Sequence, residues 1–197
     1  MTMAQITRFI EEVIACDKPM YQISVMGGEP MVHPHVEWIC KEIHTRLVLP
    51  GLVQRFNLAT NGTLPIPEWM REHMKILLSP VESKHHRRQF VAPIDTGQDT
   101  KSCKIPATCG IALNRFGYYP CGAGGAIVRL FRLPNLTKYA LPENVEAFGD
   151  LHPMCQLCQV SAVTQQMATN DEHDAPSRLF QAALAYQSRN PYRPVEY

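Results

Sequence analysis

The first eighty residues alternate between segments that predict helices and short apolar segments that predict strands. The predicted helices cover 3–15, 35–47 and 66–74, the first being amphipathic. The predicted strands are YQISVM (21–26), RFNLAT (55–60) and KILLSP (75–80), and we expect the first to be buried. Helices that alternate with strands through short connections favour an α/β fold with a parallel sheet.

The second half of the chain has a different composition, because Gly, Pro and Cys become more frequent after about residue 95. The segment GIALNRFGYYPC (110–121) predicts two short strands around Arg115–Gly117, a β-hairpin. We expect a loop over 159–175 and a final helix over 175–190. The predicted parts of the chain are residues 1–95, 96–160 and 161–197.

Composition narrows the class of protein. Of 197 residues, 45% are apolar and 19% charged, which is typical of a globular chain. A net charge of +1 gives no reason to expect a nucleic-acid or membrane-surface partner. No apolar run approaches the roughly 20 residues of a membrane span, and the N-terminus lacks the layout of a signal peptide. We therefore expect a cytoplasmic protein.

Within the segment VMGGEPMV (25–32), the residues GGEP (27–30) follow the first predicted strand directly. In parallel α/β folds, ligands bind at the carboxyl ends of the strands. Gly27 and Gly28 would let a ligand approach the backbone, Glu29 adds a negative charge, and Pro30 stiffens the exit. These residues suit a cationic amine and not a phosphate. The alternative interpretation is a Gly-Gly turn with a solvated Glu29.

A second motif ends the next predicted strand. RFNLAT is followed directly by Asn-Gly, so Thr60 and Asn61 lie at a strand end. Consecutive parallel strands are usually neighbours, and their carboxyl ends then meet at one edge of the sheet. We therefore expect these two residues to lie beside the glycine loop.

The two motifs together resemble a known family. A strand ending in GGEP, a helix and a strand ending in TNG are similar to the core of a radical S-adenosylmethionine (SAM) enzyme. The resemblance runs from the first helix to about residue 80. It implies an incomplete TIM-like barrel in which Gly27, Gly28 and Glu29 contact the methionyl amino group of SAM. Thr60 and Asn61 would lie nearby.

The cysteines predict a metal centre. Seven is a high count for a cytoplasmic protein, where disulfides are disfavoured and metal or redox chemistry explains cysteines better. Four thiolates suit either a structural zinc ion or an iron–sulfur cluster. Five of the cysteines form the pattern C-x5-C, a hairpin, a further Cys and a C-x2-C pair: Cys103, Cys109, Cys121, Cys155 and Cys158.

This half of the chain resembles the auxiliary-cluster region, of the SPASM or shorter twitch type, that follows the barrel in many radical SAM enzymes. The resemblance implies a small cysteine-rich hairpin domain with a [4Fe–4S] cluster held by Cys109, Cys121, Cys155 and Cys158. Cys103 is a fifth candidate that could replace one of them.

Other residues in or near these motifs receive structural interpretations. Cys40 falls on the apolar face of its predicted helix and is expected to be a core thiol, whereas Cys16, at a helix end, is expected to be inert. His152 could be a ligand, but a solvated loop histidine is the favoured interpretation. The hairpin aromatic residues are expected to pack the small core of this region more than to touch a substrate: Phe116, Tyr118 and Tyr119.

The 197 residues contain no C-x-x-x-C-x-x-C motif, which in the radical SAM family binds the SAM-cleaving [4Fe–4S] cluster. Cys155 and Cys158 have the right final spacing, but Leu151 stands four positions before Cys155. Three explanations remain: a fragment of a longer enzyme, a chain completed by a partner chain that supplies the missing strand and loop, or a degenerate homologue. A fragment is favoured, because Met1 stands almost at the first predicted helix.

Two functional hypotheses follow. In the first, the intact protein is a radical SAM enzyme of an oxidoreductase or modifying type, with an auxiliary [4Fe–4S] cluster. The resemblance implies reductive cleavage of SAM and hydrogen abstraction from a peptide or small molecule, although the chain as given lacks the ligands for that step. In the second, the chain is a non-enzymatic zinc- or iron–sulfur-binding module for interaction or electron transfer.

Overall fold

The computed structural model describes residues 1–79, 106 and 110–158. The chain divides into two compact units, residues 1–90 and 91–197, and each is treated by itself. The predicted loop over 159–175 and helix over 175–190 lie outside the described residues.

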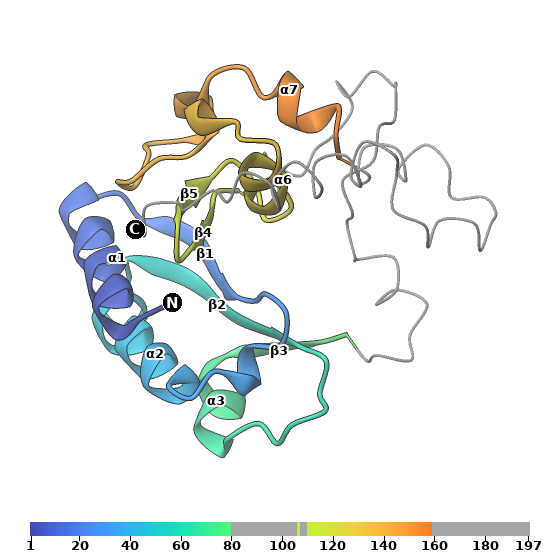
Figure 1. The fold of residues 1–197 in the computed structure, drawn as a ribbon. Coiled ribbons are helices and arrows are strands. Elements are labelled where there is room, and N and C mark those ends of the chain that lie inside the picture. The colour runs from blue at the N-terminus through green and yellow to red at the C-terminus, as the bar shows by residue number, and fades with distance from the viewer. Residues whose placement is uncertain (80–105, 107–109, 159–197) are drawn as a thin grey trace. The chain divides into compact units, whose positions relative to one another are not determined.

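The first unit has one layer of helices on a parallel sheet. Its three strands are hydrogen-bonded in the order β1-β2-β3, and both pairs are parallel. The three α-helices lie on one face of the sheet (Figure 1). This confirms the predicted α/β class, and the described residues form an open sheet and no closed barrel. The elements are α1 (Met3–Cys16), β1 (Met20–Val25), η1 (Pro30–Val32), α2 (Val36–Ile43), η2 (His44–Val48), β2 (Val53–Thr60), α3 (Glu68–His73) and β3 (Lys75–Leu78).

Local sequence explains where α1 begins and ends. The Thr2 hydroxyl accepts a hydrogen bond from the Gln5 backbone N–H, and the Gln5 side chain accepts one from the Thr2 N–H. This reciprocal capping box satisfies two donors that a helix start leaves unpaired. Asp17 ends the helix in the left-handed conformation, with φ of +49°. Between these caps, Ile10 and Val13 are fully buried.

The core of this unit lies between the helices and one face of β2. Phe56 and Leu58, two residues apart on that strand, are 5% and 0% exposed. Ile43 and Leu47, in α2 and the π-helical η2, are buried as well. Because side chains alternate along a strand, Asn57, which lies between Phe56 and Leu58, belongs to the other face of the sheet.

The prediction that 21–26 is a buried strand was half wrong. β1 forms there, but none of its six residues is fully buried, and Tyr21 is 58% exposed. The reason is its position: among the described residues β1 pairs only with β2, so it is an edge strand. Apolar residue types predicted the strand but not its place in the sheet.

The second unit contains the predicted hairpin. β4 (Ala112–Asn114) and β5 (Gly117–Tyr119) pair in antiparallel register. Tyr118 forms two backbone hydrogen bonds with Lys138, of 2.8 and 3.0 Å, which make an isolated bridge beside β5. Four further elements follow, which the sequence did not predict: α6 (Gly124–Leu130), η3 (Pro134–Leu136), η4 (Val145–Phe148) and α7 (His152–Cys155).

The hairpin aromatics supply much of the core of this unit. Tyr118 and Tyr119 are each 1% exposed and lie among other buried apolar residues. Phe116 is half-buried, and the Arg129 guanidinium lies 3.8 Å from its ring centroid. The expectation that these aromatics pack a core is therefore confirmed for the two tyrosines.

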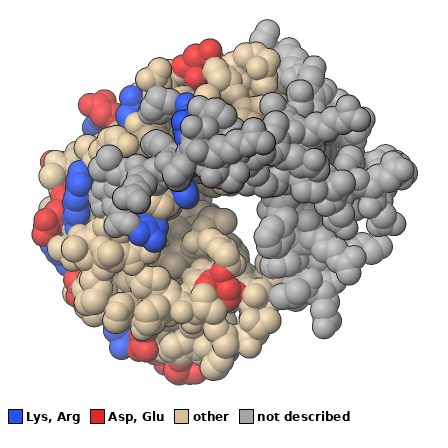
Figure 2. Space-filling model, viewed as in Figure 1, with Lys and Arg blue, Asp and Glu red and all other residues tan. Residues whose placement is uncertain are grey.

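Charge is spread over the surface. In the view of Figure 2, Lys and Arg side chains of the described residues are scattered among Asp and Glu side chains and uncharged ones. No helix within residues 1–79, 106 and 110–158 combines the length and apolarity needed to cross a bilayer.

Candidate functional site

The strand end after β1 carries Glu29. This residue precedes the short helical turn η1, and its side-chain Oε1 accepts a hydrogen bond of 3.0 Å from the Met31 backbone N–H. Pro30 occupies the first position of that turn, where its fixed φ suits a helical start and no amide N–H is needed. The Glu29 carboxylate is thereby held over the strand end.

The same carboxylate joins two strand ends. Oε1 of Glu29 accepts a hydrogen bond of 2.7 Å from the Thr60 hydroxyl, and Oε2 accepts one of 2.7 Å from the Asn61 backbone N–H. Thr60 is 3% exposed and Glu29 is half-buried. The GGEP and TNG motifs are therefore in direct contact, as expected from their places on neighbouring strands. Glu29 is therefore tied to the next strand end and is not a fully solvated side chain.

The TNG turn is fixed by its own side chains. The Thr60 hydroxyl also accepts from the Gly62 N–H at 3.2 Å. The Asn61 side-chain oxygen accepts from both the N–H and the hydroxyl of Thr63, at 2.8 and 2.7 Å. Gly62 has φ of +75°, a conformation that glycine adopts without strain. The turn therefore presents the Asn61 N–H to Glu29 in a fixed position.

The two glycines leave the backbone open beside this carboxylate. Gly27 and Gly28 are exposed, and a Cβ built on either would meet no atom within 4 Å. Gly27 has φ of +144°, which excludes most other residues. A ligand can therefore reach the peptide groups of both glycines. An anionic carboxylate next to open backbone carbonyls suits a ligand with several N–H donors, such as an ammonium group.

Three of the five clustered cysteines lie in the described part of the second unit. Cys121 and Cys158 are buried and Cys155 is half-buried. The Gly124 backbone N–H donates a hydrogen bond of 3.3 Å to the Cys121 sulfur. A Cβ built on Gly124 would lie 2.5 Å from the Met154 sulfur and 3.3 Å from the Cys121 sulfur. Gly124 thus packs closely against both Cys121 and Met154, the residue of α7 that precedes Cys155.

The Cys121 sulfur has one feature that is compatible with a cluster ligand. Backbone N–H groups that donate to cysteine sulfur are a usual feature of iron–sulfur sites and tune them. Among residues 1–79, 106 and 110–158, however, no three His, Cys, Asp or Glu side chains are grouped closely enough to hold a metal ion. Two further candidates, Cys103 and Cys109, lie outside those residues, so the four-cysteine site stays a prediction.

The remaining cysteines and His152 have different surroundings. Cys40 is fully buried in α2, and burial, followed by the negative charge of Glu37, raises the pKa of its thiol to about 12. It is the core thiol that the sequence predicted. Cys16, at the end of α1, is half-buried. His152 is exposed at the first position of α7, so it stands on a helix and not in a loop.

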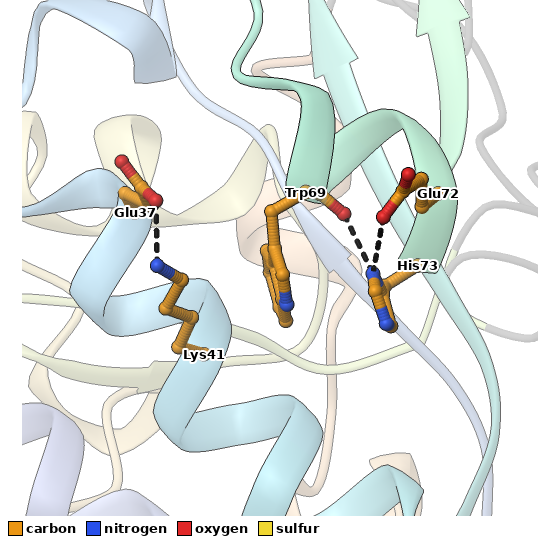
Figure 3. A network of polar contacts seen from close by, with 5 residues as sticks. All are labelled: Glu37, Lys41, Trp69, Glu72 and His73. Carbon is orange, nitrogen blue, oxygen red and sulfur yellow. Dashed lines mark hydrogen bonds and ion pairs between the residues drawn. The ribbon is translucent and has the colours of Figure 1, made fainter.

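An aromatic cluster that the sequence did not predict lies between α2, η2 and α3. Trp69 and His73 stack with ring centroids 4.7 Å apart, and His44 lies edge-on to both, at 5.4 and 4.8 Å. Lys41 forms an ion pair of 2.7 Å with Glu37 and lies on the side of the Trp69 ring that faces away from His73 (Figure 3). Burial, and then the charge of His73, lowers the pKa of His44.

A scan of protein-family models and a search of curated proteins found no match to this chain. A family assignment therefore depends on the motifs and their geometry.

Proposed function

We propose that this chain is a radical SAM family protein whose first unit binds the methionyl amino group of SAM at Gly27, Gly28 and Glu29. The observation that supports this most is the Glu29 carboxylate, which accepts hydrogen bonds from Thr60 and Asn61 on the next strand end. The contact between GGEP and TNG forms one anionic site at the carboxyl edge of a parallel sheet.

The negative charge of Glu29 is the feature that would attract the ligand. Its carboxylate accepts hydrogen bonds from Met31, Thr60 and Asn61, which fix its position at the strand end. An ammonium group could pair with this charge and donate hydrogen bonds to the exposed backbone of the glycine loop. Pro30 and the Asn61 turn keep the two loops in register while the ligand binds. These residues orient the amine; none of them is a catalytic group.

The second unit is proposed to hold an auxiliary [4Fe–4S] cluster through Cys109, Cys121, Cys155 and Cys158, with Cys103 as a fifth candidate. Support comes from the buried Cys121 sulfur, which already accepts an N–H donor from Gly124. When bound, such clusters supply one-electron chemistry or an anchor for substrate. The intact enzyme would abstract hydrogen from a peptide or small molecule. Cysteine usage of this kind supports a reducing compartment such as the cytoplasm.

A second candidate function is a zinc-bearing binding module. Cys155 and Cys158 are joined by a tight turn in which the Cys158 N–H donates to the Cys155 carbonyl at 3.1 Å. Such C-x2-C turns are equally usual in structural zinc sites.

Metal analysis separates the two candidates. The full chain is purified without oxygen, and iron, sulfide and zinc are measured per chain. Iron with sulfide supports the proposed function, and zinc without iron supports the module. Replacement of Cys155 and Cys158 by Ala should remove the metal, whereas the matched Cys16→Ala variant should keep it. Unchanged iron in the double variant would contradict the ligand assignment.

A further inference from the structure

One face of the sheet of the first unit is apolar, and the other carries polar side chains beside apolar ones. Phe56 and Leu58 of β2 are buried on the helix side, so Arg55 and Asn57 belong to the opposite face, together with the buried Val53. Sheets made only of parallel strands are usually apolar on both faces, because both are covered. The polar side chains on the second face are therefore a feature to be explained by something other than core packing.

The polar residues form a row across all three strands. Ser24 of β1 is the register partner of Asn57 of β2, and Asn57 is the partner of Lys75 of β3. Register partners in a regular parallel pair have side chains on the same face. Hydrogen bonds agree with this placement: the Ser24 hydroxyl accepts from the Asn57 side-chain amide at 3.3 Å and from that of Gln22 at 3.0 Å. We call Ser24, Asn57 and Lys75 the polar row.

The polar row and the neighbouring Arg55 carry positive charge that no acidic side chain of the described residues pairs with. Lys75 is exposed and forms no ion pair with an acidic side chain of the described residues. Arg55, one pleat below, lies with its guanidinium 4.7 Å from the Tyr21 ring centroid and likewise has no carboxylate partner there. Asn57 is only 4% exposed, and a buried amide is costly unless it is hydrogen-bonded. Ser24 supplies that bond and leaves its own O–H to donate.

The row lies close to the glycine loop. Ser24 precedes Gly27 by three residues, which is about 10 Å along a strand. A ligand that contacts Glu29 at the strand end can therefore extend over the polar row. A second molecule bound beside that ligand can do so as well.

We propose that the polar row binds the anionic group of the substrate, a carboxylate or a phosphate, through the Lys75 ammonium and the Ser24 hydroxyl. Asn57 is the positioning residue that holds Ser24. The inference rests on the proposed function, because it takes the site at Glu29 as the place of SAM. It narrows the substrate class to molecules with an acidic group.

The full chain is titrated with two probes, succinate and, separately, inorganic phosphate. Binding is followed by the chemical shifts of the backbone amide NMR signals. We expect saturable shifts at the polar row with at least one probe. Lys75→Gln should weaken that binding about tenfold, because it removes a charge-assisted contact. The matched Lys41→Gln variant, on α2 at the opposite face, should bind as the wild type does. Both variants should melt normally, since both lysines are exposed.

Three results would overturn the inference: no saturable binding of either probe, shifts that do not centre on the row, or equal binding by Lys75→Gln and wild type. Displacement of the probe by SAM would overturn it as well, because the anion would then be the carboxylate of SAM itself. SAM binding is measured separately on the same samples. SAM binding without probe binding contradicts only this inference, whereas probe binding at the row without SAM binding contradicts only the proposed SAM site.

Discussion

Oε1 of Glu29 lies 2.7 Å from the hydroxyl of Thr60, a residue 31 positions further along the chain. This contact, with the Asn61 N–H on Oε2, ties the ends of β1 and β2 together. It also fixes a negative charge beside the open backbone of Gly27 and Gly28. The same carboxylate is therefore both a structural link and the candidate ligand group.

Glu29→Gln should lower the stability of the first unit. The glutamine side chain replaces one acceptor oxygen with an NH2 group, which leaves either the Thr60 hydroxyl or the Asn61 N–H without its acceptor. We expect a loss of about 1–3 kcal/mol in the free energy of unfolding, measured with urea. Glu68→Gln, at the exposed start of α3, is the matched control and should change stability little. Equal stability of Glu29→Gln and wild type would show that the link is unimportant.

Gly124→Ala should disturb the second unit, because a methyl group there would lie 2.5 Å from the Met154 sulfur and 3.3 Å from the Cys121 sulfur. We expect a loss of about 1–3 kcal/mol and a lower metal content, from overpacking between α6 and α7. Gly122→Ala is the control, since nothing lies within 4 Å of its added Cβ. Thermal melting and metal analysis of both variants test this, and similar behaviour of the two would contradict the packing.

Cys40 should be inert to alkylation in the native protein. Burial raises the pKa of the Cys40 thiol to about 12, and the thiol is 0% exposed, so the nucleophilic thiolate is absent at neutral pH. Iodoacetamide followed by peptide mass spectrometry should find Cys40 unmodified in the native protein and modified only after unfolding. Cys40→Ser should cost about 1–3 kcal/mol, because it buries a more polar hydroxyl. Rapid native modification of Cys40 would contradict its burial.

Stability should decline in mild acid through His44. Burial and the charge of His73 lower the pKa of this imidazole from its ordinary value of 6.5. The unfolded chain then binds the proton at a higher pH than the folded one, so this contribution is complete above pH 6.5 and is lost as the pH falls towards the lowered pKa. Urea unfolding is measured at several pH values. As the pH falls, the free energy of unfolding should decline less steeply for His44→Asn than for the wild type, whereas His35→Asn should decline as the wild type does. An unchanged decline in His44→Asn would contradict this role.

The sequence predicted the alternation of the first unit well, because periodic apolar patterns of strands and helices extend over whole elements. It also placed GGEP and TNG at neighbouring strand ends. It missed the hydrogen bonds of Glu29, since a motif does not show which groups its carboxylate meets. The burial of β1 was overestimated for a similar reason: apolar types such as Tyr21 do not distinguish an edge strand from a central one.

Other misses came from contacts between distant residues. α6 begins with Gly124 and Gly125, which are poor helix formers, so local propensity argued against a helix. The structure uses their small size instead: a Cβ on Gly125 would lie 3.0 Å from the Asn114 side chain and 3.1 Å from the Tyr119 ring. The edge-on contact of His44 with Trp69 and His73 joins two helices and has no signature within either one.

The central claim is that Glu29 and the glycine loop bind the amino group of SAM. Isothermal titration of the full chain with SAM, and with an analogue whose α-amino group is replaced by hydrogen, tests it most directly. We predict at least about a tenfold preference for SAM, which Glu29→Gln abolishes and Glu68→Gln keeps. Equal affinity for the two compounds, or an undiminished preference in a folded Glu29→Gln variant, would contradict the claim.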